Sequence, residues 1–341
     1  MEVVLVQVLH PEEMFSALET ELQRTIKSIR DQDSELLEEM LTYHMGWEGE
    51  AFGTEAGGKR LRPYFVLLTS AACGGDWKRA LPAAASVELL HNFSLIHDDI
   101  QDQSSLRRGR PTVWKKWGIA QAINAGDTMF TLAQFSLLDL HKYFASDVVI
   151  QALRILQKAS IQLTKGQYLD ISYENVDELS LDAYWPMVSG KTAALLAACT
   201  QIGALTALVD ETIQGKYHRF GYLLGLAFQV RDDFLGIWGD AALTGKSNES
   251  DLLSRKKSLP VLFALEKNAE FAKYWRTGTF SSKDIPILIE NLESEGAYQY
   301  TTRKVEELTL EALGILEEVQ PQGSAGIALT ELAKKLLKRQ G

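Results

Sequence analysis

The sequence is poor in cysteine and carries no excess of positive charge, and each shortage excludes a class of protein. Two cysteines among 341 residues, Cys73 and Cys199, are too few for a disulfide framework or a cysteine-rich zinc site. The 45 acidic residues outnumber the 35 Lys and Arg residues, which argues against general nucleic-acid binding because that function needs a cationic face. Any anion that the protein binds must therefore be held by a local basic cluster.

Long uncharged apolar runs are also missing. No run of about 18 such residues exists to span a bilayer. The stretch 1–10 is apolar but lacks the basic start and small-residue cleavage site of a signal peptide. We therefore expect a cytoplasmic protein without a transmembrane segment, and two cysteines suit a reducing compartment.

Proline is scarce as well. Eight prolines leave two long tracts, 112–185 and 187–259, without a helix breaker. Segments 193–208 and 220–230 are apolar almost all round, as in central helices of a bundle, whereas 305–319 carries a charged face. Alternating strand patterns are rare, and the best lies at 3–9. The sequence predicts one all-α domain over residues 1–341.

The most informative stretch is 91–102, which continues an apolar helical pattern that begins near Leu81. On a helix, Asp98 and Asp102 lie one turn apart on the same face, where like charges repel. A cation from outside the chain must neutralise them. Oxygen ligands without cysteine indicate a hard cation such as Mg²⁺, which usually binds one or two carboxylates together with substrate phosphates.

A second acidic pair, Asp232-Asp233, is expected to end the apolar helix 220–230, with Gln229 before it. Basic packets surround both acidic motifs, at 57–63, 107–111, 190–192, Lys246 and 255–257. Acids and cations together suit a diphosphate, because metal ions bridge its oxygens to the aspartates while Lys and Arg supply charge-assisted hydrogen bonds.

Competing motifs fail on inspection. The segment 190–192, which should open a third apolar helix, resembles the end of a P-loop, but Trp185 stands where that loop needs glycine. No GxGxxG, GxSxG or HExxH occurs. His91 lies about two turns before Asp98 without a second His or Cys beside it, so it is interpreted as a phosphate donor rather than a metal ligand.

In the same order along the chain, the motifs at 57–63, 98–112, 190–192 and 228–233 resemble those of the trans-isoprenyl diphosphate synthases. The resemblance covers about residues 55–262. It implies a single large helical bundle of the isoprenoid synthase type around a central apolar cavity, typically a homodimer. It also implies a transferase that elongates an allylic diphosphate (dimethylallyl, geranyl or farnesyl) with isopentenyl diphosphate, using Mg²⁺, with three ions when substrate is bound.

The resemblance also implies roles for individual residues. The metal ligands would be Asp98, Asp102 and Asp232, which with Lys191 form the catalytic set. The residues that bind isopentenyl diphosphate would be Lys59, Arg62, His91 and Arg108. The residues that contact the allylic substrate would be Arg107, Lys191, Thr192, Gln229, Lys246 and Lys256.

One departure concerns the second motif, which reads 232–236 with Gly236 in place of its last carboxylate. Asp240 lies one turn further and is a candidate substitute. Gln167 and Asp170 are expected on a helix that lines the cavity, without an assigned role.

In the resembling enzymes, the residues four and five before the first aspartate help to form the cavity floor, and here these are Ser94 and Phe93. Small Ser94 leaves room below the diphosphate, whereas bulky Phe93 should stop extension. The combination resembles enzymes that make geranylgeranyl diphosphate (C20). The alternatives are a class I terpene cyclase, which would not need Lys59, Arg62 and Arg108, and a non-catalytic subunit of a heteromeric synthase, which would tolerate Gly236.

Overall fold

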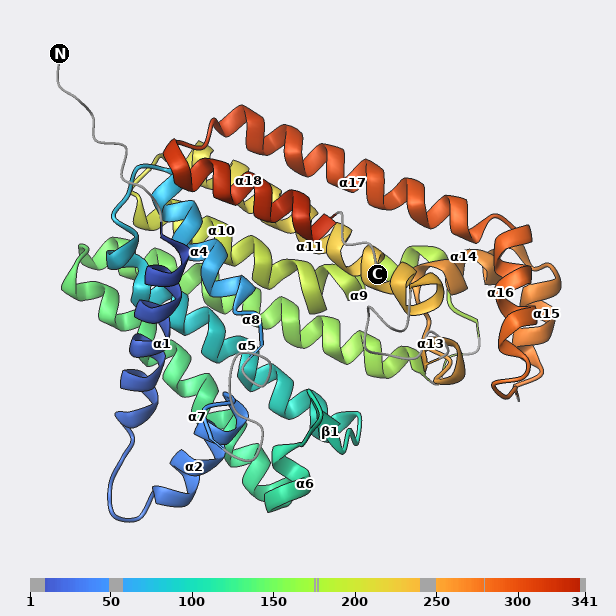
Figure 1. Cartoon of the computed structure of the whole chain (residues 1–341), viewed down its shortest axis with the longest axis horizontal. Helices are drawn as coiled ribbons and strands as arrows, with labels where there is room; N and C mark the ends of the chain where they lie inside the picture. Colours follow the sequence, from blue (N-terminus) through green and yellow to red (C-terminus); the bar gives the residue numbers. More distant parts are fainter. Residues whose placement is uncertain are drawn as a thin grey trace. The chain divides into compact units, whose positions relative to one another are not determined.

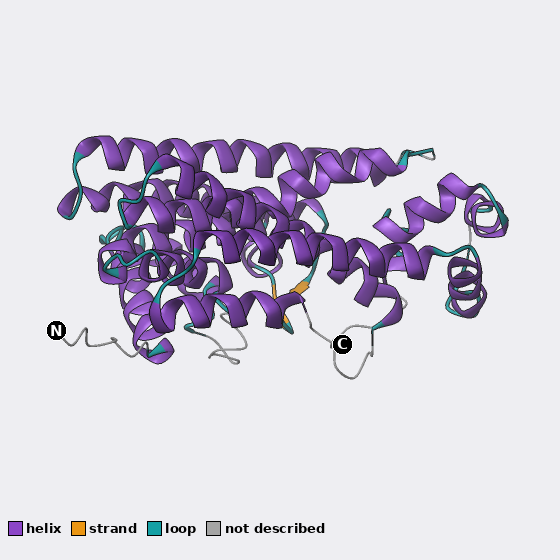
Figure 2. Ribbon diagram, turned by 90° about the horizontal axis from the view of Figure 1, so that it is seen from above, coloured by secondary structure: helices purple, strands orange, loops and turns teal. Residues whose placement is uncertain are grey.

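The computed structural model describes residues 10–48, 58–174, 176, 178–239, 250–278 and 280–337. In this part of the chain the fold is all-α, as the sequence predicts, with a single two-stranded hairpin (Figures 1 and 2). The expected strand at 3–9 lies outside the described residues. None of the described helices is both long enough and apolar enough to cross a bilayer.

The chain divides into two compact units, each built from separate stretches of sequence. Unit 1 comprises residues 1–157, 199–214 and 321–329, and unit 2 comprises 158–198, 215–320 and 330–341. Helices α8 (Ser146–Glu174), α10 (Ala194–Thr206), α11 (Glu211–Trp238) and α18 (Gly323–Leu337) contribute residues to both. The expectation of one domain over 1–341 stays a prediction.

Unit 1 is organised around α5, which carries the first acidic motif. Its elements are α1 (Pro11–Lys27), α2 (Glu35–His44), α4 (Leu61–Ala72), η1 (Trp77–Ala80), α5 (Leu81–Gln101), β1 (Leu106–Arg107), β2 (Arg110–Pro111), α6 (Val113–Trp117), α7 (Ile119–Leu138) and η2 (Asp139–Lys142). Pro82 lies in the first turn of α5, where its missing N–H costs nothing. The helix ends at Gln101 with Asp102 as its C-cap, and the next residue, Gln103, adopts a left-handed backbone (φ 52°) that turns the chain away.

Two buried hydrogen bonds fix α5 against α7. Ser86 donates to the carbonyl of Ala133 at 2.6 Å, and Ser136 donates to the carbonyl of Pro82 at 2.9 Å. Nearer the acidic motif, the His97 ring lies directly against Gly126, where a Cβ would be only 2.3 Å from the ring. Contacts with α7 thus hold α5 from its first turn to the part that precedes the aspartates.

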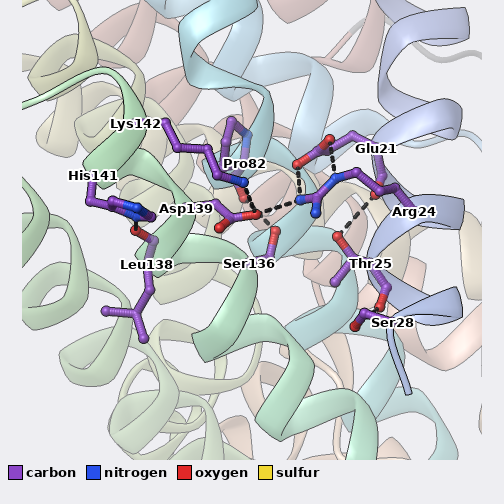
Figure 3. Close-up of polar contacts among 10 residues, drawn as sticks. All are labelled: Glu21, Arg24, Thr25, Ser28, Pro82, Ser136, Leu138, Asp139, His141 and Lys142. Atoms are coloured by element: carbon purple, nitrogen blue, oxygen red, sulfur yellow. Dashed lines mark hydrogen bonds and ion pairs between the residues drawn. The ribbon is translucent and has the colours of Figure 1, made fainter. Parts of the chain in front are cut away.

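Polar contacts attach α1 to η2, the short helix that follows α7 (Figure 3). Arg24 donates to Glu21 on its own helix at 2.7 Å and to Asp139 at 2.5 Å. Lys142 pairs with the same Asp139 carboxylate at 2.9 Å. These partly exposed pairs add modestly to stability, and buried Met14, Leu18 and Leu22 supply the main contact of α1 with the core.

Unit 2 carries the second acidic motif on α11. Its further elements are η3 (Leu181–Ala183), α9 (Tyr184–Val188), η4 (Ser189–Ala193), α13 (Ser250–Leu253), α14 (Leu259–Lys267), α15 (Glu270–Arg276), α16 (Ile285–Ser294) and α17 (Ala297–Val319). One apolar cluster joins α9, α11, α14 and α17 through Tyr184, Val230, Leu262 and Val305. A second cluster packs α14, α15 and α16 together. The charged face predicted for 305–319 is found on α17, which spans that segment.

Candidate active site

The first acidic motif occupies the last turns of α5, and its aspartates differ in their surroundings. The Asp98 side chain is 20% exposed, and Asp102, the residue that caps the helix, is also exposed. Asp99 is 2% exposed, and both of its oxygens accept the Nε–H of Arg107 at 2.9 Å, while Nη2 lies 2.8 Å from Oδ1. Asp99 is therefore committed to Arg107, and the accessible carboxylates are those of Asp98 and Asp102.

Arg107 belongs to a hairpin in which β1 and β2 are joined by only two residues, Arg108 and Gly109. Both have positive φ, 52° and 75°, as a type I′ turn requires. This backbone is costly for Arg, so Arg108 is held in a strained conformation. A Cβ on Gly58 would lie 2.5 Å from Arg108 Nη2, so the guanidinium lies directly against the glycine that precedes Lys59.

The predicted ligands of isopentenyl diphosphate are partly brought together. Arg62 on α4 donates to His91 Nε2 on α5 at 3.1 Å. Burial, and then the neighbouring Arg62, hold the pKa of His91 well below its usual range. The ring is therefore neutral and accepts from Arg62 through Nε2. Lys59 is exposed at the start of α4, beside the glycine that contacts Arg108.

The middle cation of this packet, Arg60, has a different role from its neighbours. Its side chain is 5% exposed and pairs at 2.8 Å with both Glu19 and Glu88. It caps α4 with a left-handed backbone (φ 46°) and donates to the Met45 carbonyl. Arg60 thus anchors α4 to α1 and α5 from inside, which sequence reasoning missed because a GKR packet does not reveal which cation is buried.

The second acidic motif repeats the contrast between accessible and buried aspartates. Asp232 is exposed, whereas Asp233 is 1% exposed and accepts four hydrogen bonds. Its donors are Tyr184 Oη at 2.7 Å, Gln229 Nε2 and Lys256 Nζ at 3.1 Å, and Leu259 N at 3.2 Å. Thr192 donates to Gln229 at 2.8 Å. Three predicted contacts of the allylic substrate, Thr192, Gln229 and Lys256, are therefore linked through Asp233.

The structure corrects two expectations about this region. The pair at 232–233 does not end its helix, because α11 continues to Trp238, where Ile237 is buried and Trp238 packs on the second cluster. The segment 190–192 does not open a helix either. It forms a π-helical turn, Ser189–Ala193, between α9 and α10, a feature frequent at functional sites.

This π turn holds Lys191 beside α8. Lys191 pairs with Asp170, a residue to which the sequence analysis assigned no role. A Cβ on Gly166 would lie 2.0 Å from Lys191 N, and one on Gly190 would lie 2.4 Å from Gln162 O. The backbones of α8 and the π turn therefore touch, which is possible only with glycine at both positions.

Several predictions stay open. Asp240 and Lys246 lie outside the described residues. Across the stretches that the structure describes, no three His, Cys, Asp or Glu side chains gather as a metal site made of protein ligands alone. Asp98 and Asp232 belong to different units, so their convergence on one metal cluster stays a prediction.

The residues of the predicted cavity floor lie on α5. The Phe93 ring contacts His97 edge-on at 4.9 Å and the Phe130 ring of α7 at 5.1 Å, both measured between centroids. Ser94 is half-buried and donates to the His91 carbonyl at 2.7 Å. Phe93 thus belongs to an aromatic group between α5 and α7, and its role in chain length stays a prediction.

Comparisons with known proteins agree with the motifs. The polyprenyl synthetase family model matches residues 51–285. The geranylgeranyl diphosphate synthase of Mycobacterium tuberculosis H37Rv is 44% identical over 253 residues, 74% of this chain and 70% of that one. The (2E,6E)-farnesyl diphosphate synthase of Mycobacterium bovis is 36% identical over 327 residues, 93% and 90% of the two chains.

Solved structures give the same result for the fold. The crystal structure of a polyprenyl synthetase from Streptomyces coelicolor A3(2) superposes with a TM-score of 0.86 at 35% identity, covering 95% of this chain and 98% of that one. The geranylgeranyl pyrophosphate synthetase from Pyrococcus horikoshii gives 0.86 at 31% identity, covering 96% and 99%.

Proposed function

Since the chain belongs to the polyprenyl synthetase family, we propose that it condenses isopentenyl diphosphate head-to-tail with allylic diphosphates. The observation that carries the proposal is the matched arrangement of the two acidic motifs. In each motif an accessible aspartate, Asp98 or Asp232, directly precedes a buried aspartate that is bonded to a predicted substrate-binding cation. Two anionic groups and several cations are what a diphosphate with bridging metal ions requires.

The donor set fits Mg²⁺, the ion that the family is known to use. Asp98 and Asp102 offer oxygen ligands one turn apart at the end of α5, whereas Asp99 is already paired with Arg107. Hard oxygen ligands of this kind, completed by phosphate oxygens and water, are what Mg²⁺ prefers. With Asp232 they would hold the ions, whose positive charge would stabilise the leaving diphosphate.

The residues of the chain would then bind and orient the two substrates. Lys59, Arg62 and Arg108 hold the diphosphate of isopentenyl diphosphate, with His91 fixing Arg62. Arg107, Lys191 and Lys256 donate to the diphosphate of the allylic substrate, with Thr192 and Gln229 beside it, and so stabilise the negative charge that develops as its C–O bond breaks.

Carbon–carbon bond formation needs little further help from the protein. The isopentenyl double bond supplies the electron pair of the new bond to the allylic carbon. A proton is then lost from the adjacent carbon to the released diphosphate, and a new double bond forms. Apolar helix walls exclude water, which would otherwise capture the allylic cation.

We propose geranylgeranyl diphosphate as the main product. The relatives include both geranylgeranyl and farnesyl diphosphate synthases, so the length assignment depends on Phe93 and Ser94. The Phe93 ring, packed on Phe130, would limit extension. We expect Phe93→Ala to lengthen the product, and an unchanged or shorter product would contradict this assignment of the cavity floor.

The direct test uses the purified chain with isopentenyl diphosphate, Mg²⁺ and each of the three allylic diphosphates. Products are dephosphorylated and separated by chain length. We expect a C20 product that disappears on chelation of the metal. Cyclic hydrocarbons from the allylic substrate alone would instead indicate a terpene cyclase. Failure of the chain to turn over alone, with activity only beside a partner synthase, would indicate a non-catalytic subunit.

We also propose a homodimer. Four large apolar side chains of α7 are exposed, namely Ile119 (54%), Ile123 (42%), Phe135 (58%) and Leu138 (44%). Apolar groups gathered on one exposed helix are typical of an interface. Light scattering should give twice the chain mass for the wild type, and Phe135→Asp should lower it. A monomeric wild type would contradict the proposal.

A further inference from the structure

The short segment between α13 and α14 carries Lys256, one of the proposed ligands of the allylic substrate, and contacts several elements of unit 2. Lys256 donates to Asp233 on α11 at 3.1 Å. The next residue, Lys257, donates to the carbonyls of Tyr173 and Glu174 at the end of α8. The position of this segment therefore affects both contacts, and it depends on how the residue before Lys256 is held.

That residue, Arg255, has a left-handed backbone with φ 56°. This conformation is costly for arginine and persists only where the surrounding structure fixes it. The same conformation occurs at Arg60 and Arg108, which belong to two other basic packets with predicted substrate ligands. Backbone strain of this kind tends to gather at functional sites, so the surroundings of Arg255 bear on the site.

The Arg255 side chain is held by the end of α15. Its Nη2 atom donates at 3.2 Å to the carbonyl of Trp275, in the last turn of that helix, where basic side chains are favoured. The guanidinium carbon lies 5.2 Å from the centre of the Trp275 ring and 5.7 Å from that of Phe280, within the range of a cation–π contact. Because Trp275 is 2% exposed and belongs to the second apolar cluster of unit 2, it is a firm support.

A fixed segment favours substrate binding through Lys256. Lysine has a flexible four-carbon side chain, and ordering it when the ligand binds weakens the affinity. Arg255 holds the backbone from which Lys256 extends, and Asp233 holds its ammonium group. Much of the ordering is then complete before the diphosphate arrives, so less binding free energy is lost.

We propose that Arg255 is a positioning residue for the allylic substrate, which holds the segment before α14 against the end of α15 and so orders Lys256 for the diphosphate. The inference rests on the proposed function and deepens it, because it gives α15, a helix without any proposed ligand, a part in substrate binding. The observation that carries it is a left-handed arginine, fixed by Trp275, directly before a proposed ligand.

The first test measures steady-state kinetics with each substrate varied in turn. Arg255→Ala removes the donor and the cation, and we expect KM for the allylic diphosphate to rise about three- to tenfold while KM for isopentenyl diphosphate stays within about twofold. Arg255→Lys keeps a cation and an N–H donor and should recover most of this loss. Arg276→Ala, at the exposed last residue of α15, is the matched control. Equal rises of both KM values in Arg255→Ala overturn the inference, because they indicate a general loss of structure.

A double-mutant cycle with Lys256→Ala separates positioning from a merely structural role. If Arg255 acts through Lys256, Arg255→Ala should change KM for the allylic diphosphate by less than about twofold once Lys256 is absent. The same rise in both backgrounds overturns the inference, since the two residues would then act independently.

A third measurement does not depend on turnover. Hydrogen exchange in peptides that cover residues 254–258 should be faster in Arg255→Ala than in wild type, and close to wild type in Arg255→Lys and Arg276→Ala. Should Arg255→Ala not fold, Arg255→Gly, which tolerates the left-handed backbone, takes its place in all three measurements. Unchanged exchange in the folded variant overturns the inference. Absence of prenyl transfer by the wild type overturns the proposed function instead, and the exchange rates still decide whether Arg255 holds the segment.

Discussion

The two acidic motifs share a sequence, a pair of consecutive aspartates, but they differ in how the second aspartate is held. Asp99 is held by one arginine, Arg107, which also reaches to 3.8 Å from Asp98. Asp233 is held by four donors on four parts of unit 2, namely α9, α11, the segment before α14 and the first residue of α14. The first motif is thus a local ion pair, and the second is a junction of the fold.

The difference indicates what each region tolerates. In the first region, Arg107 contacts both the buried Asp99 and the predicted metal ligand Asp98. Its guanidinium can therefore shift between the two carboxylates without a movement of a helix. In the second, the buried aspartate fixes Lys256 and, through Gln229, Thr192. A change at Asp233 should therefore disturb both stability and the predicted substrate contacts, whereas a change at Asp99 should act mainly on Arg107.

The largest effect is expected when the accessible aspartates are changed, which tests what the two motifs have in common. Asp98→Asn and Asp232→Asn should each lower kcat about 10³-fold, because each removes a charged side chain that we propose as a metal ligand. Their melting temperatures should stay near wild type, since both side chains are solvent-accessible. Asp127→Asn, at an exposed aspartate of α7, serves as the control. A residual rate within about tenfold of wild type would remove that residue from the metal site.

Changing the buried aspartates tests the contrast itself. Asp233→Asn should lower the free energy of unfolding by about 2–3 kcal/mol, because an amide cannot accept all four hydrogen bonds. Asp99→Asn should cost about 1 kcal/mol, since burial already raises the pKa of Asp99 and makes its charge less favourable. Urea denaturation of both variants measures the difference. Equal losses would show that the two buried aspartates have the same structural weight.

Acidification should weaken the first region through its neutral histidines. The pKa of His44 is about 3 in the fold, beneath the ordinary 6.5, because of burial and three arginines, with His91 also nearby. Between about pH 6.5 and pH 3, His44 binds a proton in the unfolded chain but not in the folded protein. The contribution of neutral His44 to the free energy of unfolding is therefore complete above about pH 6.5 and is lost as the pH falls towards 3.

At about pH 5 the loss from His44 should reach about 2 kcal/mol. Urea denaturation near neutral pH and near pH 5 should show a smaller loss in His44→Asn than in wild type by this amount. An identical pH dependence in the two proteins would mean that His44 titrates normally in the fold.

The smallest effect is expected from a single donor of the second junction. Tyr184→Phe deletes the hydroxyl that donates to Asp233 at 2.7 Å but keeps the buried ring. Because Leu259 N still serves the same oxygen, we expect a loss of about 1 kcal/mol in unfolding free energy. A loss as large as that of Asp233→Asn would place most of the junction's strength in this one hydrogen bond.

Sequence periodicity and motif spacing predicted the all-α fold and the helix that carries the first motif, because buried helices leave long apolar patterns. They did not predict that the helix at 220–230 continues to Trp238, since the apolar contacts of Ile237 and Trp238 are tertiary. The π turn at 189–193 was missed for a related reason, namely that it depends on backbone contact between Gly166 and Gly190.

Within the candidate site, residue type revealed the cations and acids but not which of them are internal. Arg60, Asp99 and Asp233 each stand beside a predicted ligand in the sequence, and only burial and hydrogen bonding separate them from it.

The left-handed backbone at Arg108 sets the stability of the hairpin against the proposed role of this side chain in substrate binding. A two-residue hairpin turn is most stable with Asn or Gly at this position, and Arg there costs of order 1 kcal/mol. A library screened only for heat resistance should therefore drift away from arginine at 108, and a library screened for turnover should restore it.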